Sequence, residues 1–405
     1  MKILVITRTL AEFSNLQGKF RAMARLGIEL TVVSPHRWAG RSTEIEQVNA
    51  DGYELILHPC RFSGTKSVRL GNHLHFYPMI SHVIAKGKWD LVHIDEEPFN
   101  FATYHALREC RRHCTPAIFT TWQNVNKDYP PPFNFFERYV FEYSVGGMAG
   151  NAEGLKLLGQ RGFRKKRAQV RHLGVDPRLF CKKDASSLRR RLGLEGVFVI
   201  GFVGRMDSQK GLDTLVRAFA RLSSPAALLL LAGRGSYWTK LKTLIADLGI
   251  APKVQLVPWV TSSEVPDYMN CFDILVLPSR TLPNLKEQFG RVLVEAMACE
   301  TCVIGSDSGD IPNVIGDSGL VFHENDDREL ARYIEMLIGD SSLREFLGSR
   351  GRTRVIEKFS YAKIAKEAVD FYREVLASLN STHDEGRLFA EDEALIALGK
   401  HSQQQ

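Results

Sequence analysis

The sequence predicts an α/β protein built from two doubly wound, Rossmann-like domains that face a cleft. Short apolar runs rich in β-branched residues alternate with amphipathic helical segments, and this alternation occurs twice. Apolar runs of this kind, buried on both faces and separated by helices, are typical of parallel sheets. The length of 405 residues is long for one hydrophobic core and sufficient for two.

In the first half of the chain, the alternation predicts one parallel sheet with helices between its strands. The run ILVIT leads into Thr and Arg without a small-residue cleavage site, so we interpret it as a buried strand rather than as a signal peptide. These elements define an N-terminal domain over residues 1–177. We expect helices at 15–26 and 99–112, and strands at 3–7, 30–34, 54–58, 91–95, 117–121 and 146–150.

The second half repeats the pattern and defines a C-terminal domain over residues 178–360. Polar and basic residues replace the periodicity near 175–196, which marks the junction. A helix at 361–380 is expected to cross back to the N-terminal domain. Residues 381–405 form a polar tail in which 391–399 could be a short helix and the last residues, HSQQQ, are expected to be disordered. We expect strands at 197–204, 227–233, 253–257, 273–279 and 302–306, and helices at 211–222, 237–248, 262–270 and 290–298.

The composition is that of an ordinary globular protein, with 44% hydrophobic and 24% charged residues. No run approaches the roughly 20 apolar residues of a membrane span. Seven scattered cysteines, an odd number, favour a reducing cytoplasm. Cys299 and Cys302 form a C-x2-C pair, but no second pair or histidine accompanies them, so we expect no metal site.

The net charge of +7 is unevenly distributed, and six cations fall within residues 161–172. A basic surface attracts anionic lipid headgroups, nucleic acids or phosphorylated substrates. Because no nucleic-acid module accompanies the charge, we expect no nucleic-acid partner. We therefore interpret this basic run as a site that binds an anionic membrane surface. The alternative is a solvated helix end with no binding role. The six cations are Arg161, Arg164, Lys165, Lys166, Arg167 and Arg171.

The motif GFVGRMDSQKG, residues 201–211, follows a strand and opens a helix. Gly204 lets the backbone approach a ligand closely. Arg205 offers a planar fork for phosphate oxygens, and Lys210 offers a mobile point charge. Helix N-termini also favour anions. Cations near a helix start are common, so an ordinary helix start is the alternative, and the motif does not match a P-loop.

Glu287 and Glu295 lie eight positions apart in EQFGRVLVEAMA. On a continuous helix this spacing is roughly 12 Å, whereas the two carboxylates of a retaining glycoside hydrolase lie about 5–5.5 Å apart. The spacing suits two groups that hold opposite ends of a long polar ligand. Taken alone, two solvated glutamates explain it equally well.

Two further glycine turns follow strands of the same half. Gly233 lies in AGRGS (232–236), and Gly309 lies in SDSGDIPNVI (306–315), where Pro312 sits in the first helical turn. Free N–H groups there could hold a phosphate or a hydroxyl, and a simple capped helix is the alternative. In order, the motifs place cations, N–H donors and two carboxylates at the carboxyl ends of successive strands, where open α/β sheets bind ligands. This set suits a nucleotide sugar.

These segments resemble the donor domain of the GT-B glycosyltransferases, in particular the large retaining family four, also called the group 1 glycosyltransferases. The resemblance covers residues 197–325 strongly and residues 1–176 more diffusely. The motifs that carry it are GFVGRMDSQKGLDTLVRAFARL, LLLAGRGS, DILVLPS, EQFGRVLVEAMACETCVIGSDSG and GLVF.

The resemblance implies a role for each donor-side residue. Arg205 and Lys210 would stabilise the diphosphate leaving group, Glu295 would hold the ribose, and Glu287 would face the transferred sugar. Contacts to phosphate, sugar and base would come largely from backbone at Gly204, Gly233, Phe289, Gly290, Arg291, Gly309 and, near the base, Val260. The resemblance further implies retention of anomeric configuration and no prosthetic group or metal, and the chain has no D-x-D placed to hold one.

The chain departs from the family pattern at three positions, two of which lie in the N-terminal half. Gln123 occupies a position where the family often has histidine, Asn313 replaces an acidic residue, and only Gly18 stands where paired glycines are frequent. Glu96 and Glu97 end a strand at the presumed acceptor side, and either could contact the acceptor. A capped helix start is the alternative for both.

These observations predict a cytoplasmic retaining glycosyltransferase, peripheral on the inner face of the membrane, which moves a sugar from a UDP- or GDP-sugar to a glycan or lipid-linked acceptor. The N-terminal domain would bind the acceptor and the C-terminal domain the donor. Two alternatives stay open, namely a catalytically silent nucleotide-sugar binding protein and a nucleotide-sugar epimerase on the same architecture.

Overall fold

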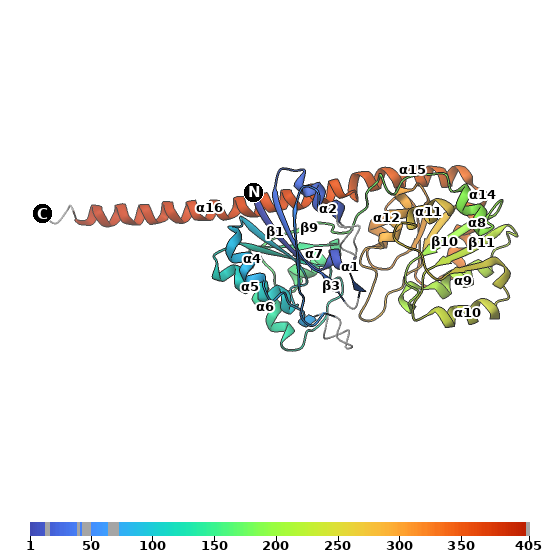
Figure 1. Cartoon of the computed structure of the whole chain (residues 1–405), viewed down its shortest axis with the longest axis horizontal. Coiled ribbons are helices and arrows are strands. Elements are labelled where there is room, and N and C mark those ends of the chain that lie inside the picture. The colour runs from blue at the N-terminus through green and yellow to red at the C-terminus, as the bar shows by residue number, and fades with distance from the viewer. Residues whose placement is uncertain (13–16, 39–40, 43–49, 64–72, 402–405) are drawn as a thin grey trace.

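The computed structural model describes residues 1–12, 17–38, 41–42, 50–63 and 73–401 (Figure 1). Positions 15 and 16 of the expected helix 15–26, and most of the HSQQQ end, lie outside these residues. Two parallel sheets with helices on both faces form the two domains, which confirms the predicted fold class.

The N-terminal sheet has the strand order β5-β2-β1-β6-β7-β8-β9, and every pair is parallel. Strand β9 was not predicted, because its sequence KRAQ carries no apolar run. It is an exposed edge strand and therefore needs no second buried face. The strands are β1 (Lys2–Thr7), β2 (Glu29–Pro35), β5 (Glu54–His58), β6 (Leu91–Asp95), β7 (Ala117–Thr121), β8 (Gly146–Ala149) and β9 (Lys166–Gln169), and β3 (Arg37–Trp38) and β4 (Arg41–Ser42) form a separate antiparallel pair.

The C-terminal sheet has the order β12-β11-β10-β13-β14-β15, again entirely parallel. The direction of the strand order reverses at β10 and β13, so the loops after these two strands open at the point where doubly wound sheets bind ligands. The strands are β10 (Phe198–Val203), β11 (Ala227–Ala232), β12 (Val254–Val257), β13 (Ile274–Leu277), β14 (Cys302–Ser306) and β15 (Leu320–Phe322).

Helices cover both faces of each sheet. In the N-terminal domain these are α1 (Thr9–Glu12), α2 (Gln17–Ala24), α4 (Ile80–Gly87), α5 (Phe101–Arg112), α6 (Phe133–Tyr143) and α7 (Ala152–Gln160). In the C-terminal domain they are α8 (Ser186–Leu192), α9 (Leu212–Ala220), α10 (Trp238–Asp247), α11 (Val265–Cys271), α12 (Arg291–Ala298), α13 (Ile311–Ile315), α14 (Asp327–Gly339) and α15 (Ser341–Lys358), with 3₁₀ turns at Ser208–Lys210 and Ala251–Lys253.

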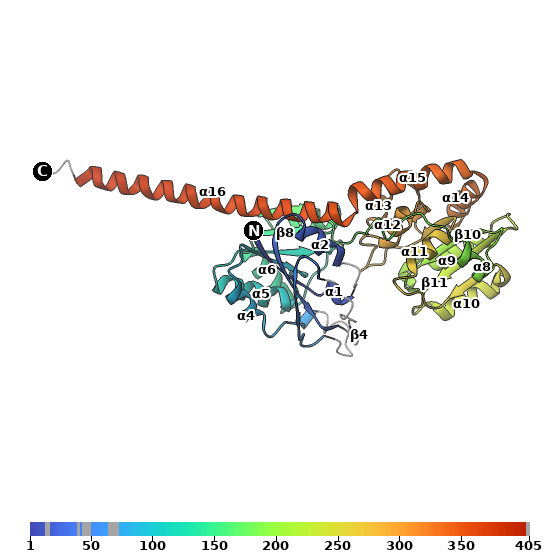
Figure 2. The same cartoon turned by 45° about the horizontal axis from the view of Figure 1, so that its top comes forward.

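The last helix, α16 (Tyr361–His401), crosses from the C-terminal to the N-terminal domain, as predicted (Figures 1 and 2). Its buried side chains, including Ala365, Phe371 and Tyr372, join the core formed by Ile3 and Val5. The helix is longer than expected, because it continues past residue 380 to His401 instead of ending at a polar tail. The polar segment contains no proline, and polarity alone does not end a helix.

Candidate functional site

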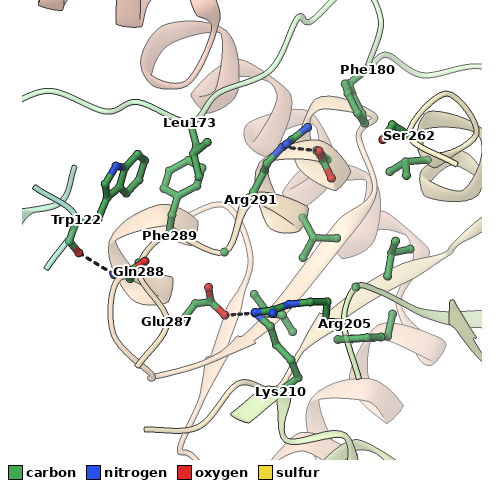
Figure 3. Close-up of a pocket in the computed structure, with 18 residues that line it drawn as sticks. Trp122, Leu173, Phe180, Arg205, Lys210, Ser262, Glu287, Gln288, Phe289 and Arg291 are labelled. Carbon is green, nitrogen blue, oxygen red and sulfur yellow. Dashed lines mark hydrogen bonds and ion pairs between the residues drawn. The ribbon is translucent and has the colours of Figure 1, made fainter. Parts of the chain in front are cut away.

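A cavity of about 410 Å³ lies between the two domains at the carboxyl ends of β10 and β13 (Figure 3). It brings together most of the donor-side residues predicted from the sequence. These are Gly204, Arg205, Lys210, Glu287, Phe289, Gly290, Arg291 and Glu295, joined by Trp122, Leu173, Phe180, Phe202, Val203, Ser262, Val265, Leu277, Gln288 and Val292.

Glycines shape the turn that follows β10. Gly204 has a φ of 151° and little around its Cα, since an added Cβ would come no nearer than 3.4 Å to the Phe202 ring. Gly233 does not line the cavity. A Cβ there would lie 1.9 Å from the carbonyl oxygen of Gly204, so Gly233 lets the neighbouring turn pack directly against the cavity wall. Its role is therefore to position Gly204.

Arg205 and Lys210 approach the cavity from this turn, as Figure 3 shows. The Arg205 side chain is 77% exposed, and its Nε lies 3.7 Å from the Asp207 carboxylate, so its planar fork is accessible to a ligand. Lys210 is mostly buried, and its Nζ lies 2.5 Å from Oε2 of Glu287. One cation is therefore open to solvent, and the other is held by a carboxylate.

Glu287 is buried beside this cation. Ser279 donates a second hydrogen bond to the same carboxylate oxygen, at 2.8 Å. Burial opposes ionisation of Glu287, but Lys210 and Ser279 outweigh it and keep the pKa of the carboxyl below its ordinary value. Glu287 is therefore an anion at neutral pH, which suits hydrogen bonding to hydroxyls and not proton donation.

The Gly309 turn packs against the backbone of Glu287. A Cβ at Gly309 would lie 1.9 Å from the Glu287 carbonyl oxygen, and its φ of +57° is in the left-handed region that favours glycine. The amide of Asp310 donates to the same carbonyl, at 3.1 Å. Gly309 does not line the cavity, so its contribution is to allow the loop that carries Glu287 to sit against α13.

Helix α12 begins at the cavity. Gly290 precedes it with a φ of +76°, and Phe289 is buried with its ring 5.7 Å from that of Phe359. One turn into the helix, the Arg291 guanidinium lies 2.8 Å from Glu295. Burial raises the pKa of the Glu295 carboxyl, and Arg291 opposes that rise. Glu287 and Glu295 thus line one cavity, and each is paired with a cation.

Val260, the residue expected near a nucleobase, does not line this cavity. It is partly buried and packs against the core of the C-terminal domain, while Ser262 and Val265 face the cavity instead.

The N-terminal domain holds the loop that carries Glu287. Asn124 donates to the carbonyl of Glu287 and Asn151 donates to the carbonyl of Gln288, both at 3.1 Å. The Gln288 side chain donates to the carbonyl of Trp122, at 2.9 Å (Figure 3). An ion pair between Lys286 and Glu153 adds a charged contact. These interdomain contacts could not be found from the sequence, because they join main-chain atoms to residues far away in the chain.

Of the four acceptor-side candidates, Gly18 and Gln123 make local contacts. A Cβ at Gly18 would lie 2.4 Å from the ring of Tyr361, so this glycine lets α2 pack closely against α16. The Gln123 side chain donates to the carbonyl of Val125, at 2.6 Å. Neither side chain lines the cavity.

Glu96 and Glu97 are adjacent in sequence, but their environments differ. Glu96 is buried, with Arg8 at 3.6 Å and His75 at 3.3 Å. Burial disfavours its charge, but these two groups outweigh burial and lower the pKa of its carboxyl. Glu97 accepts hydrogen bonds from Thr121 Oγ1 (2.6 Å) and the Trp122 amide (2.8 Å), yet burial raises its pKa to about 7.

A buried polar network behind Trp122 was not predicted. Its centre is Asp95, which lies 3.6 Å from Lys19 and 3.9 Å from His172 and accepts a hydrogen bond from Thr7. Burial lowers the pKa of His172 to about 3, so the imidazole is neutral. The ring of His172 lies 4.8 Å from that of Trp122, which lines the cavity. The polar residue Asp95 at a strand end was visible in the sequence, but its partners come from other elements.

Within residues 1–12, 17–38, 41–42, 50–63 and 73–401, no group of three histidine, cysteine or acidic side chains is arranged to hold a metal. Among those residues, no helix is both long and apolar enough to span a bilayer.

The comparison with protein families agrees with this geometry. Residues 184–354 match the family described as "Glycosyl transferases group 1". The resemblance inferred from the motifs is therefore confirmed.

Curated relatives support the same family assignment for part of the chain. An alpha-maltose-1-phosphate synthase of Mycobacterium tuberculosis is 35% identical over 44% of this chain and 48% of its own length. A D-inositol 3-phosphate glycosyltransferase of Stackebrandtia nassauensis is 31% identical over 50% of this chain and 48% of its own length. The chain thus spans about half the length of the curated relatives it matches.

Solved structures extend the likeness to both domains. Anabaena HepE in complex with UDP superposes with a TM-score of 0.73, at 19% identity, over 92% of this chain and 100% of that one. Sucrose-phosphate synthase from Thermosynechococcus elongatus gives a TM-score of 0.71, at 19% identity, over 93% and 100%. At this identity the likeness concerns the fold alone, and it confirms the two-domain GT-B arrangement.

Proposed function

We propose that this protein is a retaining glycosyltransferase that moves a sugar from a nucleotide diphosphate to an acceptor hydroxyl. The observation that carries the proposal is the convergence of two cations, Arg205 and Lys210, and two carboxylates, Glu287 and Glu295, on one cavity. This set suits a ligand with a diphosphate in its middle and a polyhydroxyl group at each end. The family match over residues 184–354 supports the same conclusion.

The ion pair between Lys210 and Glu287 suggests how the donor is held. Lys210 neutralises Glu287 at 2.5 Å. A diphosphate placed near Arg205 would compete for Lys210, because charge-assisted bonds to phosphate are strong. If Lys210 exchanged Glu287 for the diphosphate, Lys210 would neutralise the leaving group. Glu287 would then be free to accept hydrogen bonds from the sugar. The diphosphate, stabilised by the two cations, would then act as base for the incoming hydroxyl on the same face of the sugar.

The donor screen should begin with UDP-sugars. Structural relatives of this chain include Anabaena HepE in complex with UDP-glucose, which supports testing that donor first. We further propose that the reaction needs no divalent metal, since Arg205, Lys210 and the N-terminus of α12 can neutralise phosphate charge. Turnover that survives EDTA would support this part, and turnover restored only by Mg²⁺ or Mn²⁺ would contradict it.

The decisive experiment combines binding with turnover. Thermal unfolding in the presence of UDP- and GDP-sugars identifies the donor, because a ligand that binds only the folded state raises the melting temperature. Slow release of free nucleotide from that donor then indicates a transferase. Binding without nucleotide release would identify a silent binding protein, and conversion to an isomeric nucleotide sugar would identify an epimerase. The anomeric configuration of the product, measured by NMR, tests retention.

We also propose an acceptor in glycan or glycolipid assembly on the inner face of a membrane. A capsular polysaccharide biosynthesis glycosyltransferase of Staphylococcus aureus is 35% identical over 44% of this chain, which supports this class of acceptor.

The basic run 161–172 is a weak basis for membrane binding, because most of its cations form contacts within the protein. Arg161 pairs with Glu137 at 2.5 Å, Arg167 donates to the Phe163 carbonyl, and Lys165 donates to the Ser144 carbonyl.

A further inference from the structure

A continuous strip of aromatic rings runs over the outer face of α5 and α6 and onto the segment before α4. Both helices lie on the side of the N-terminal sheet away from α16 (Figures 1 and 2). Successive ring centroids along the strip are 4.6–6.4 Å apart. In order, the aromatic strip consists of Phe62, Phe76, Phe101, Tyr104, Phe135, Tyr139 and Tyr143.

The strip is open to solvent. Phe62 is 59% exposed and Phe135 is 47% exposed, and the other rings are partly exposed. Single exposed apolar side chains are common on proteins, but a contiguous apolar patch with a polar rim marks an interaction surface. The two tyrosines at its end place polar hydroxyls beside apolar rings, as side chains at a membrane–water interface do.

Cations surround the strip. The exposed charged residues of α5 and α6 are four arginines, Arg108, Arg111, Arg112 and Arg138, and one glutamate, Glu142. The Arg111 guanidinium lies 3.4 Å from the centroid of the Tyr143 ring and donates to the Tyr139 hydroxyl, at 2.9 Å. The aromatic strip and its cations therefore form one surface.

Half of this positive charge, that of Arg108 and Arg138, is not balanced by a paired carboxylate within the described part of the chain. Arg112 pairs with Glu109, at 2.8 Å. Neither Arg108 nor Arg138 forms an ion pair with any residue that the structure describes. The surface is thus cationic as well as aromatic.

We propose that this α5–α6 face is a docking surface for a bilayer that contains anionic lipids. Arginines attract the headgroups, and the phenylalanine and tyrosine rings enter the interface between headgroups and acyl chains. Charge complementarity favours this occupant over a second copy of the chain, which would present the same positive face. The inference does not rest on the proposed function, because lipid binding is measured without donor or acceptor.

Vesicle flotation of the full chain tests the proposal. Binding to phosphatidylcholine vesicles that contain phosphatidylglycerol, little binding to phosphatidylcholine alone, and release by raised salt are expected. Each cation near an anionic surface contributes about fivefold to binding, so the double variant Arg108→Glu/Arg138→Glu should bind at least about 25-fold more weakly. Phe135→Ser should weaken binding by a smaller factor that raised salt does not remove.

The C-terminal domain offers a matched control. Phe346 is 55% exposed with Arg350 over its ring, so Phe346→Ser removes a similar side chain outside the proposed surface and should leave flotation unchanged. Unaltered melting temperatures would show that all three variants fold. No flotation of the wild-type chain at low salt would overturn the proposal. Two further results would also overturn it: loss of flotation in Lys166→Glu but not in the arginine variant, or self-association through this face without vesicles.

Discussion

The two domains share an architecture but use their charged residues differently. In the C-terminal domain, Glu287 and Glu295 line the cavity and are each held by one cation that a ligand could displace. In the N-terminal domain, Glu96 and Asp95 lie in buried networks, with Arg8 and Lys19 among their partners. The first arrangement is poised for exchange with a ligand, and the second stabilises the protein around it.

This difference separates residues that could touch the donor from residues that position them. The N-terminal domain reaches the cavity chiefly through Trp122. The side-chain amides of Asn124 and Asn151 donate to main-chain carbonyls of the loop that carries Glu287 and hold it in place. Closure of the two domains and the orientation of Glu287 are therefore coupled. Substitutions of residues that could touch the donor should therefore lower the rate of transfer directly. Substitutions in the N-terminal domain should instead act through the position of the Glu287 loop or through stability.

The largest effect is expected for Glu287→Ala. Loss of a group that acts on the transferred sugar should lower kcat about 100–1000-fold, in line with the loss of one preorganised polar contact in other active sites. Binding of the free nucleotide should change little. Glu195→Ala, at an exposed position of the same domain, is the control. Undiminished transfer by Glu287→Ala would remove this residue from the central role.

Arg205→Ala should have the next largest effect. A charge-assisted bond to phosphate contributes about 1.5–3 kcal/mol, so the variant should lose about 10–100-fold in kcat/KM. Arg205→Lys should recover part of this loss, because it restores charge without the planar fork. Arg221→Ala, which removes a surface partner of Asp327, serves as the control. Equal rates for Arg205→Ala and the wild type would place the diphosphate elsewhere.

The contrast between the domains also explains what could be predicted from the sequence. Strand runs and glycine turns are local signals, so the two sheets and the cavity residues Arg205, Lys210 and Glu287 were found. Gly233 and Gly309 were predicted to contact the ligand, but in the structure they contact neighbouring backbone and do not line the cavity. The network around Asp95 could not be predicted, because its members come from α2, β6 and the segment before α8, which only the fold brings together.

Asn151→Asp sharpens the comparison, because it tests whether the N-terminal domain positions the loop that carries Glu287. Asn151 caps α7 by accepting a hydrogen bond from the Gly154 amide, at 2.7 Å, and it donates to the Gln288 carbonyl. Aspartate keeps the cap, since it is as good an N-cap as asparagine, but loses the donor. Because Asn151 is fully buried, the new carboxylate would lose its hydration and face a carbonyl oxygen, so the melting temperature should fall. The lost hydrogen bond to the Glu287 loop should also lower kcat by about fivefold to tenfold.

Asn126→Asp is the matched control for this substitution. Asn126 is exposed in the same domain and accepts a hydrogen bond from Arg161, which aspartate can also accept. Its kcat should equal that of the wild type. If Asn151→Asp lowered the melting temperature but left kcat unchanged, Asn151 would be purely structural and the loop of Glu287 would not depend on the N-terminal domain.

The last prediction concerns stability and its dependence on pH, and it uses the neighbours Glu96 and Glu97. Burial raises the pKa of Glu97 to about 7, so the folded state retains a proton that the unfolded state has lost above its ordinary pKa of about 4.3. Stability should therefore fall as pH rises through this window, by on the order of 2–4 kcal/mol. Glu97→Gln should flatten that fall in urea denaturation.

Glu96→Gln should act in the opposite sense. The pKa of Glu96 is lowered in the folded state, where Arg8 and His75 outweigh burial, so its charge contributes stability above the unfolded pKa, and this stability is lost as pH falls through the folded one. The variant should be less stable than the wild type at neutral pH and should approach it in acid. Identical pH profiles for the two variants would show that Glu97 is as well paired as Glu96. In that case the strand end would carry two anions, and a contact between Glu97 and the acceptor would gain support.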